Sequence, residues 1–142
     1  MAGMTAVTLI SEAYNVQPGD TVLVHTVAGG MGLSLAQLIA ARGATVIGTT
    51  SAPSKAAIAK AHGAAHVILY KDEDVVQRVL ALTDGKGVDA VFDGVGKDTF
   101  EIDLKVIKTS GTIVGYGVTS GMVPPFQLLG FAEKNAKYTF AS

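Results

Sequence analysis

A glycine-rich turn joins a short apolar run to a helical segment near the start of the chain. The apolar run is Thr21–His25, the turn spans residues 25–32 (HTVAGGMG), and a helix is expected from Leu33 to Arg42, where Gly43 ends it. Glycines at such a turn let the backbone approach a ligand, and the free N–H groups of a helix start attract phosphate. The pattern predicts a βα unit that binds a nucleotide by its phosphates.

The same rhythm continues along the chain. Further strands are expected at 45–49, 66–70, 88–93, 111–115 and 137–141, and further helices at 3–16, 53–62, 72–82, 99–108 and from about 126. Strands that alternate with helices form parallel sheets with right-handed crossovers. Residues 1–142 are therefore expected to form one α/β domain, a Rossmann doubly wound parallel sheet of about six strands with helices on both faces.

Composition narrows the function classes. Eleven Lys and Arg residues against twelve Asp and Glu residues give a net charge of −1, which does not favour nucleic acid as a partner. No apolar run is long enough to cross a membrane. The absence of cysteine excludes thiolate chemistry and favours a reducing, cytoplasmic setting.

The expected second strand indicates which dinucleotide fits. Sites that prefer NAD place Asp or Glu near the end of this strand, but no carboxylate occurs from Thr21 through Lys71. Ser51 and Lys55 lie at the start of the next helix, where a hydroxyl and an ammonium would attract an additional phosphate. Lys55 alone would more often be a solvated helix lysine, but the missing acid favours NADPH over NADH.

Several motifs, in the same order along nearly the whole chain, carry a family resemblance. They are Gly3-Met4-Thr5-Ala6, Val24-His25, Ala28-Gly29-Gly30-Met31-Gly32, Gly48-Thr49, Lys55, Ile68-Leu69-Tyr70-Lys71, Val91-Phe92-Asp93-Gly94-Val95-Gly96 and Gly115-Tyr116-Gly117. The chain thereby resembles the zinc-free quinone oxidoreductases, the zeta-crystallin-like branch of the medium-chain dehydrogenases. In that family NADPH delivers a hydride to a quinone or to a carbonyl conjugated to an alkene.

The resemblance assigns roles to individual positions. It implies Gly30 and Met31 at the pyrophosphate, with Gly29 and Gly32 also among the cofactor-binding residues of the turn. It further implies Ser51 and Lys55 at the 2′-phosphate, Tyr70 at the adenosine end, and Thr5, Val118, Thr119 and Ser120 near the nicotinamide. The chain departs from the family pattern at Val27 and Met31, and Val118-Thr119 replaces an asparagine-serine pair. No catalytic residue is assigned.

The resemblance also implies an architecture. Members are more than twice this long and carry a separate substrate-side, GroES-like domain, so this chain is expected to be the cofactor domain, with little activity alone. The small-molecule quinone or enone would be its substrate, and an edge strand near Lys137 would pair two copies into a homodimer. A non-catalytic NADPH sensor or a nucleic-acid-binding crystallin-like module remains the alternative, with a methyltransferase third.

Other chemistry finds little support in the sequence. Without cysteine, three histidines (His25, His62 and His66) cannot assemble the zinc ligands of zinc-containing relatives. No tyrosine has a lysine four residues later, which excludes a short-chain dehydrogenase pair. His25 is expected to be a packing or hydrogen-bonding residue, and Asp93 to bond backbone or ribose.

Overall fold

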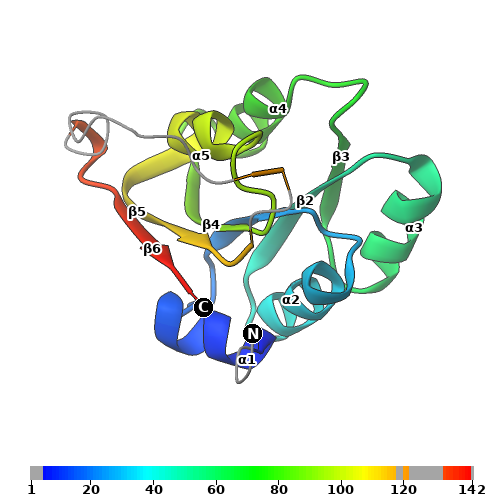
Figure 1. Ribbon diagram of the computed structural model, residues 1–142, viewed down its shortest axis with the longest axis horizontal. Helices are drawn as coiled ribbons and strands as arrows, with labels where there is room; N and C mark the ends of the chain where they lie inside the picture. The colour runs from blue at the N-terminus through cyan, green and yellow to red at the C-terminus, as the bar shows by residue number, and fades with distance from the viewer. Residues whose placement is uncertain (1–4, 118–119, 122–132, 142) are drawn as a thin grey trace.

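A single parallel sheet organises the part of the chain that the computed structural model describes, residues 5–117, 120–121 and 133–141. Its strands are β1 (Thr21–His25), β2 (Thr45–Thr50), β3 (His66–Leu69), β4 (Val88–Asp93), β5 (Ile107–Gly115) and β6 (Lys137–Phe140). They lie in the order β3-β2-β1-β4-β5-β6 (Figure 1). Every neighbouring pair is parallel, as the alternation of strands and helices predicts.

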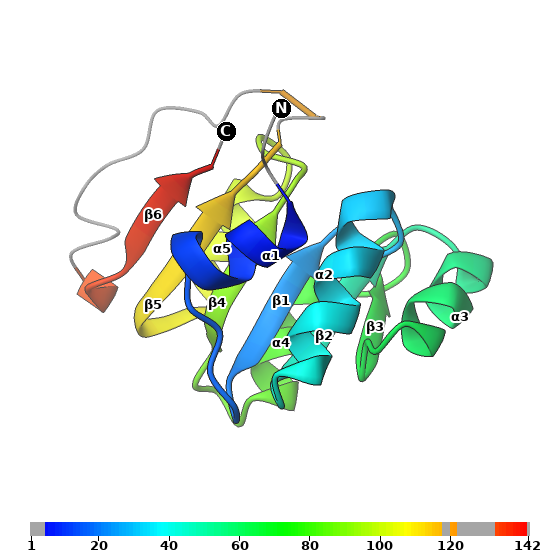
Figure 2. The same cartoon turned by 90° about the horizontal axis from the view of Figure 1, so that it is seen from below.

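Helices cover both faces of this sheet. They are α1 (Ala6–Thr8), the π-helix η1 (Leu9–Ala13), α2 (Gly30–Ala41), α3 (Pro53–Ala61), α4 (Val75–Leu82) and α5 (Phe100–Val106). Figure 2 shows α1, α2 and α3 on one face and α4 and α5 on the other. The Rossmann doubly wound sheet expected from the sequence is confirmed.

Two apolar clusters fix these layers. In β1, Val22 and Val24 point into the cluster under α1, α2 and α3, whereas Leu23 points into the cluster under α4 and α5. All three side chains are fully buried. A strand buried on both faces reads as a continuous apolar run, which is why the strand positions could be found in the sequence.

The amino-terminal helix is shorter than expected. Instead of a helix over 3–16, α1 and η1 end at Ala13, and Tyr14 is extended. The guanidinium of Arg42, at the end of α2, donates to the carbonyls of Ile10 (2.8 Å) and Val16 (3.4 Å) and so ties η1 and the segment after it to α2.

Three other boundaries differ from the prediction. Helix α2 begins at Gly30 rather than Leu33. Helix α4 begins at Val75 rather than residue 72, because the Asp74 side chain accepts from the N–H of Gln77 and caps it. Strand β5 begins at Ile107, inside the expected helix 99–108. The short helix expected from about residue 126 lies outside the described residues.

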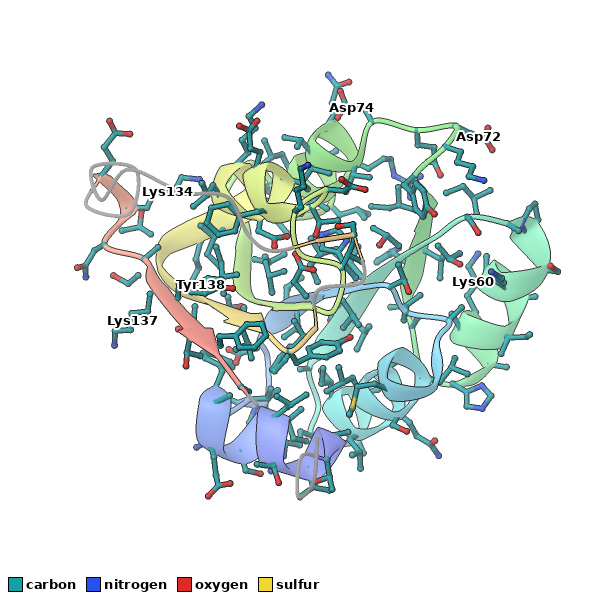
Figure 3. All side chains as sticks on the ribbon, in the orientation of Figure 1. Lys60, Asp72, Asp74, Lys134, Lys137 and Tyr138 are labelled. Carbon is teal, nitrogen blue, oxygen red and sulfur yellow. The ribbon has the colours of Figure 1, made fainter. Side chains whose placement is uncertain are left out.

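Strand β6 forms one edge of the sheet, as expected. Ahead of it, the Lys134 ammonium donates to the carbonyls of Leu104, Lys105 and Ile107 at 2.8–3.1 Å and so closes the C-terminal end of α5. Tyr138 packs edge-on against Phe100 of α5, with ring centroids 5.7 Å apart. Figure 3 labels Lys134 and Tyr138 on this side of the molecule. No helix among the described residues has the length and apolarity to cross a membrane.

Candidate nucleotide-binding site

The carboxyl ends of the strands meet at one edge of the sheet, and the strand order reverses direction between β1 and β4. The helix that follows β1 covers one face, and the helix that follows β4 covers the other (Figure 2). In open α/β sheets, ligands bind in the crevice that this divergence creates. Three cavities are lined by residues at the ends of these strands, by the turns and helices that follow them, and by residues 5–7 at the start of α1.

The glycines of the turn after β1 serve two different purposes. A Cβ added at Gly30 would meet nothing within 4 Å, and one at Gly29 would reach only Thr26 Oγ1 at 4.0 Å. A Cβ at Gly32 would instead overlap the Thr26 carbonyl oxygen. Packing therefore requires Gly32, whereas Gly29 and Gly30 keep the backbone open to solvent.

Helix α2 begins at this open backbone. Gly29 is its N-cap and has no side chain to satisfy the first N–H groups of the 12-residue helix. These groups, with the positive end of the helix dipole, suit an anion. The open glycines and the uncapped helix start therefore fit the pyrophosphate of a dinucleotide.

Val27 stands where the strict dinucleotide fingerprint has its first glycine. Its side chain is fully buried and packs on Gly48 of β2, where any Cβ would overlap it. Its N–H donates to the carbonyl of Thr49 at 2.9 Å. The glycine in β2 thus makes room for the larger residue in the turn, so this departure from the fingerprint preserves a close-packed turn.

One cavity, of about 170 Å³, brings together four of the residues predicted to bind cofactor, namely Gly29, Ser51, Lys55 and Tyr70. Thr26, Ala28 and Thr50 complete its lining. Lys55 is exposed on the first turn of α3, and no carboxylate lines the cavity among the described residues. Hydroxyls and one ammonium around a small hollow suit a phosphate group.

A second cavity, of about 400 Å³, joins Thr5, Gly30 and Met31. The Thr5 hydroxyl also accepts from the N–H of Thr8 at 3.2 Å and caps α1. Gly32 is buried and lines none of the three cavities. Seven of the predicted site residues therefore line these two cavities, Gly29, Ser51, Lys55 and Tyr70 in one and Thr5, Gly30 and Met31 in the other.

The remaining predicted residues follow β5. The Ser120 hydroxyl donates to the carbonyl of Val95 at 2.8 Å and accepts from the N–H of Asp98 at 2.9 Å. Ser120 thus lies against the turn between β4 and α5. Val118 and Thr119 lie outside the described residues.

A third cavity, of about 300 Å³, contains residues that the sequence analysis did not assign to the site. It is lined by His25, Thr26, Thr49, Tyr70, Glu73, Asp74, Val75, Val76, Val95, Asp98, Thr99 and Ile102. It shares Thr26 and Tyr70 with the Lys55 cavity, so the two adjoin. These residues could have been identified from the predicted topology, because most of them lie at or after the carboxyl ends of adjacent parallel strands.

His25 forms the floor of this third cavity. Its Nδ1 lies 2.8 Å from Thr49 Oγ1, and its Nε2 lies 3.0 Å from Asp103 Oδ1. Complete burial lowers the pKa of His25 more than the charge of Asp93 raises it. The lowered pKa favours the neutral imidazole. The contact with Thr49 confirms the expectation that His25 is a hydrogen-bonding residue.

Asp93 orders the turn between β4 and α5. Its Oδ1 accepts from the N–H groups of Val95 (2.7 Å) and Gly96 (3.0 Å), and its Oδ2 accepts from the Thr99 hydroxyl at 2.5 Å. Burial raises the pKa of Asp93, but a hydrogen bond with Asp103, the nearby His25 and the Thr99 and Gly96 donors outweigh it, so the pKa is lowered overall. The expected bond from Asp93 to backbone is confirmed.

Together, the doubly wound sheet, the open glycine turn and the cavities beside it define a Rossmann-type nucleotide-binding domain. Residues 30–140 match the family described as zinc-binding dehydrogenase, and the chain belongs to that family.

Relatives within this family include quinone oxidoreductases. The chain is 41% identical to "Quinone oxidoreductase" of Pseudomonas aeruginosa over 97% of its own length and 42% of that protein's. It is 41% identical to "2-haloacrylate reductase" of a Burkholderia species, over 91% of this chain and 39% of that one. The resemblance to quinone oxidoreductases is confirmed, and the chain spans about two fifths of the length of these curated relatives.

Solved structures support the same fold. The crystal structure of Escherichia coli quinone oxidoreductase complexed with NADPH superposes with a TM-score of 0.91 at 37% identity, over 96% of this chain and 42% of that one. A Pseudomonas syringae quinone oxidoreductase superposes with a TM-score of 0.94 at 42% identity, over 99% of this chain and 43% of that one.

The family description mentions zinc, but the residues of this chain do not fit a catalytic zinc site. The sequence has no cysteine. In the described part of the chain, one group of three potential ligands comes close enough to hold a metal, His25, Asp93 and Asp103. Both carboxylate oxygens of Asp93 already accept hydrogen bonds, and the group is buried, whereas catalytic zinc needs an open coordination position.

Proposed function

We propose that this chain is the NADPH-binding domain of a quinone oxidoreductase that reduces quinones or conjugated carbonyls. The Lys55 cavity carries the proposal, because it offers one ammonium and several hydroxyls beside an open glycine turn and no carboxylate. A carboxylate there would repel the 2′-phosphate that distinguishes NADPH from NADH. The NADPH complex of the Escherichia coli relative supports the cofactor assignment.

In this proposal the Lys55 cavity and the cavity beside Met31 receive different parts of the cofactor. The backbone of Gly29 and Gly30 and the start of α2 bind the pyrophosphate beside Met31, with Gly32 packed behind them. Ser51 and Lys55 bind the 2′-phosphate and Tyr70 covers the adenosine.

The reactive end of the cofactor is assigned to residues near Thr5, which shares a cavity with Gly30 and Met31. Thr5, Val118, Thr119 and Ser120 are assigned to the nicotinamide, which supplies a hydride when bound. For the hydride step, the residues of this chain contribute orientation of the cofactor and exclusion of water.

Calorimetric titration with NADPH and with NADH tests this function directly. NADPH should bind with clearly higher affinity than NADH, because only NADPH presents a phosphate to the Lys55 cavity. Equal affinities for the two coenzymes, or no binding of either, would contradict the proposal.

The activity of the whole family member needs more than these residues. The relatives are more than twice as long, and we assign the substrate-side wall to their additional, GroES-like part. The 142-residue chain by itself should therefore bind NADPH but reduce quinones only slowly. Steady oxidation of NADPH by this chain with a simple quinone would contradict that expectation. We place the protein in a reducing, cytoplasmic setting.

Strand β6 supports a homodimer. It is an edge strand, and Phe140 at its end is 47% exposed. Open edges pair readily with a second copy. Light scattering should give twice the monomer mass at tens of micromolar protein, and a monomer mass would refute pairing through β6.

A further inference from the structure

Two carboxyl groups and one imidazole meet behind the 300 Å³ cavity. His25 comes from β1, Asp93 from β4 and Asp103 from α5, and their donor and acceptor atoms lie within 4.8 Å of one another. The three residues are 1%, 4% and 0% exposed. Among the described residues, neither aspartate forms an ion pair with a lysine or arginine. The cluster therefore contains two acids without a cation to balance both.

The hydrogen bonds of the two acids differ. Asp93 receives donors from Val95, Gly96 and Thr99, so its negative charge is stabilised where it stands. In the described part of the chain, Asp103 Oδ1 and Oδ2 and His25 Nε2 are buried without a hydrogen bond of regular geometry, although Nε2 and Oδ1 are 3.0 Å apart. Two carboxylates only accept, so a bond between Asp93 and Asp103 requires one proton. The poorly solvated Asp103 is the group that should hold it.

We propose that Asp103 is protonated at neutral pH and is a positioning residue of the nucleotide crevice, donating to Asp93 while it holds the neutral imidazole of His25. The positioning role rests on the proposed function, but the protonation does not. Four residues of the 300 Å³ cavity hydrogen-bond directly to His25 or Asp93 or belong to the cluster, namely His25, Thr49, Val95 and Thr99. The proton on Asp103 thus holds His25 and Asp93 in place, and these two residues position the cavity residues that they contact.

The surroundings of Asp103 favour its neutral form. Burial, the hydrogen bond with Asp93 and the charge of Asp93 raise its pKa well above the ordinary value. The ionisable groups that face the cluster are His25 from β1, Asp93 from β4, Tyr116 after β5 and Tyr138 from β6, while α4 presents Val75 and Val79. Burial raises the pKa of both tyrosines, so they stay neutral and add no charge.

The sign of the pH dependence follows from this raised pKa. Above about pH 4 an unfolded aspartate has lost its proton, whereas folded Asp103 keeps it. The folded state therefore binds one more proton, and its stability decreases as pH rises until the folded pKa is passed. In that window the folding equilibrium constant should fall about tenfold per pH unit relative to a variant without the acid.

Asp103→Asn is the informative variant, because an amide is neutral, has nearly the same shape and can still donate to Asp93. Glu101→Gln removes one negative charge from an exposed position of the same helix and serves as the matched control. Asp103→Ala removes the donor. Urea unfolding from pH 5 to 9, with NADPH titrations at the same pH values, measures stability and binding for each protein.

The expected results separate the two parts of the proposal. Asp103→Asn should bind NADPH within about threefold of wild type at pH 7 and should lack the pH slope, Glu101→Gln should retain the slope, and Asp103→Ala should bind about tenfold more weakly. NADPH affinity of the wild type should decrease at alkaline pH while that of Asp103→Asn does not. If the slope appears but no protein binds NADPH, the proposed function fails and the protonated Asp103 stands.

Other outcomes overturn the inference. A wild type without the slope, or an Asp103→Asn variant as impaired as Asp103→Ala, would mean that Asp103 is ionised and paired with a charged histidine. One equivalent of zinc in the purified wild type, absent from Asp103→Asn, would mean that a cation neutralises the cluster. If Asp103→Asn fails to fold, carboxyl carbon NMR of the wild type decides, because Asp103 must titrate well above pH 4.

Discussion

The two sides of the nucleotide crevice are built in opposite ways. On the β2–α3 side, Lys55 is exposed and Ser51 half-buried, and both lie around a small hollow without carboxylates. On the β4–α5 side, Asp93 and Asp103 are buried and hold backbone and imidazole in place. One side offers charge to a ligand, and the other uses charge to shape the protein. We therefore expect cofactor selectivity and site geometry to depend on different residues, which can be altered separately.

The turn between the two sides should show the largest effect. In Gly32→Ala the new methyl group would overlap the Thr26 carbonyl, so the variant should lose about 3 kcal/mol of unfolding free energy in urea. Gly30→Ala is the matched control, because its methyl group would meet no protein atom. It should fold as wild type and yet bind NADPH more weakly. Equal stability losses in both variants would contradict the division of the glycines into packing and ligand-facing positions.

The exposed side should show an intermediate effect. Lys55→Ala should weaken NADPH binding about tenfold by calorimetry and leave NADH binding unchanged, since a hydrogen bond to a charged group contributes about 1.5 kcal/mol. Lys60→Ala, further along the same exposed helix (Figure 3), is the control and should change neither affinity. An unchanged preference between the coenzymes in Lys55→Ala would remove the basis for assigning NADPH.

An acid at the rim of the crevice should show the smallest effect. Glu73 accepts from the N–H of Leu69 at 2.8 Å and pairs with Arg78, and these contacts lower its pKa against a smaller opposing contribution from burial. The Glu73 carboxylate stabilises the folded state at pH values above its ordinary pKa, and this stabilisation is lost as pH falls through the lowered pKa of the folded state. Glu73→Gln should therefore be slightly less stable than wild type at pH 7.

Acidic conditions provide the control for Glu73→Gln. At low pH the wild type is protonated too, so the urea midpoints of the two proteins should converge. A difference that does not shrink as pH falls through the lowered pKa of Glu73 would assign the effect to side-chain shape instead of charge.

The exposed side could largely be predicted from the sequence. The glycine turn, Ser51 and Lys55 lie next to expected strand ends, and their chemistry can be inferred from short-range order. The sheet could be predicted for the same reason, because strands buried on both faces are continuous apolar runs. Helix boundaries could not, since Arg42 and Asp74 set two of them through side-chain bonds.

The buried side could not be predicted. Asp103 follows His25 by 78 positions along the chain, and only the crossing of α5 over β1 and β4 brings the two within 3.0 Å. The helical period places Asp103 on the buried face with Phe100 and Val106, unlike the exposed Glu101, but nothing in the sequence indicates that His25 and Asp93 face it there. The joining of Thr5 to Met31 in one cavity likewise depends on how α1 packs against α2.

The contact between Val27 and Gly48 restricts how this turn can change through evolution. A side chain can be introduced at position 48 only after the residue at position 27 has become smaller, because the reverse order passes through an overlapping intermediate. The two positions, 21 residues apart, therefore cannot drift independently. As long as position 27 is valine, any single substitution of Gly48 would create a steric overlap in the turn.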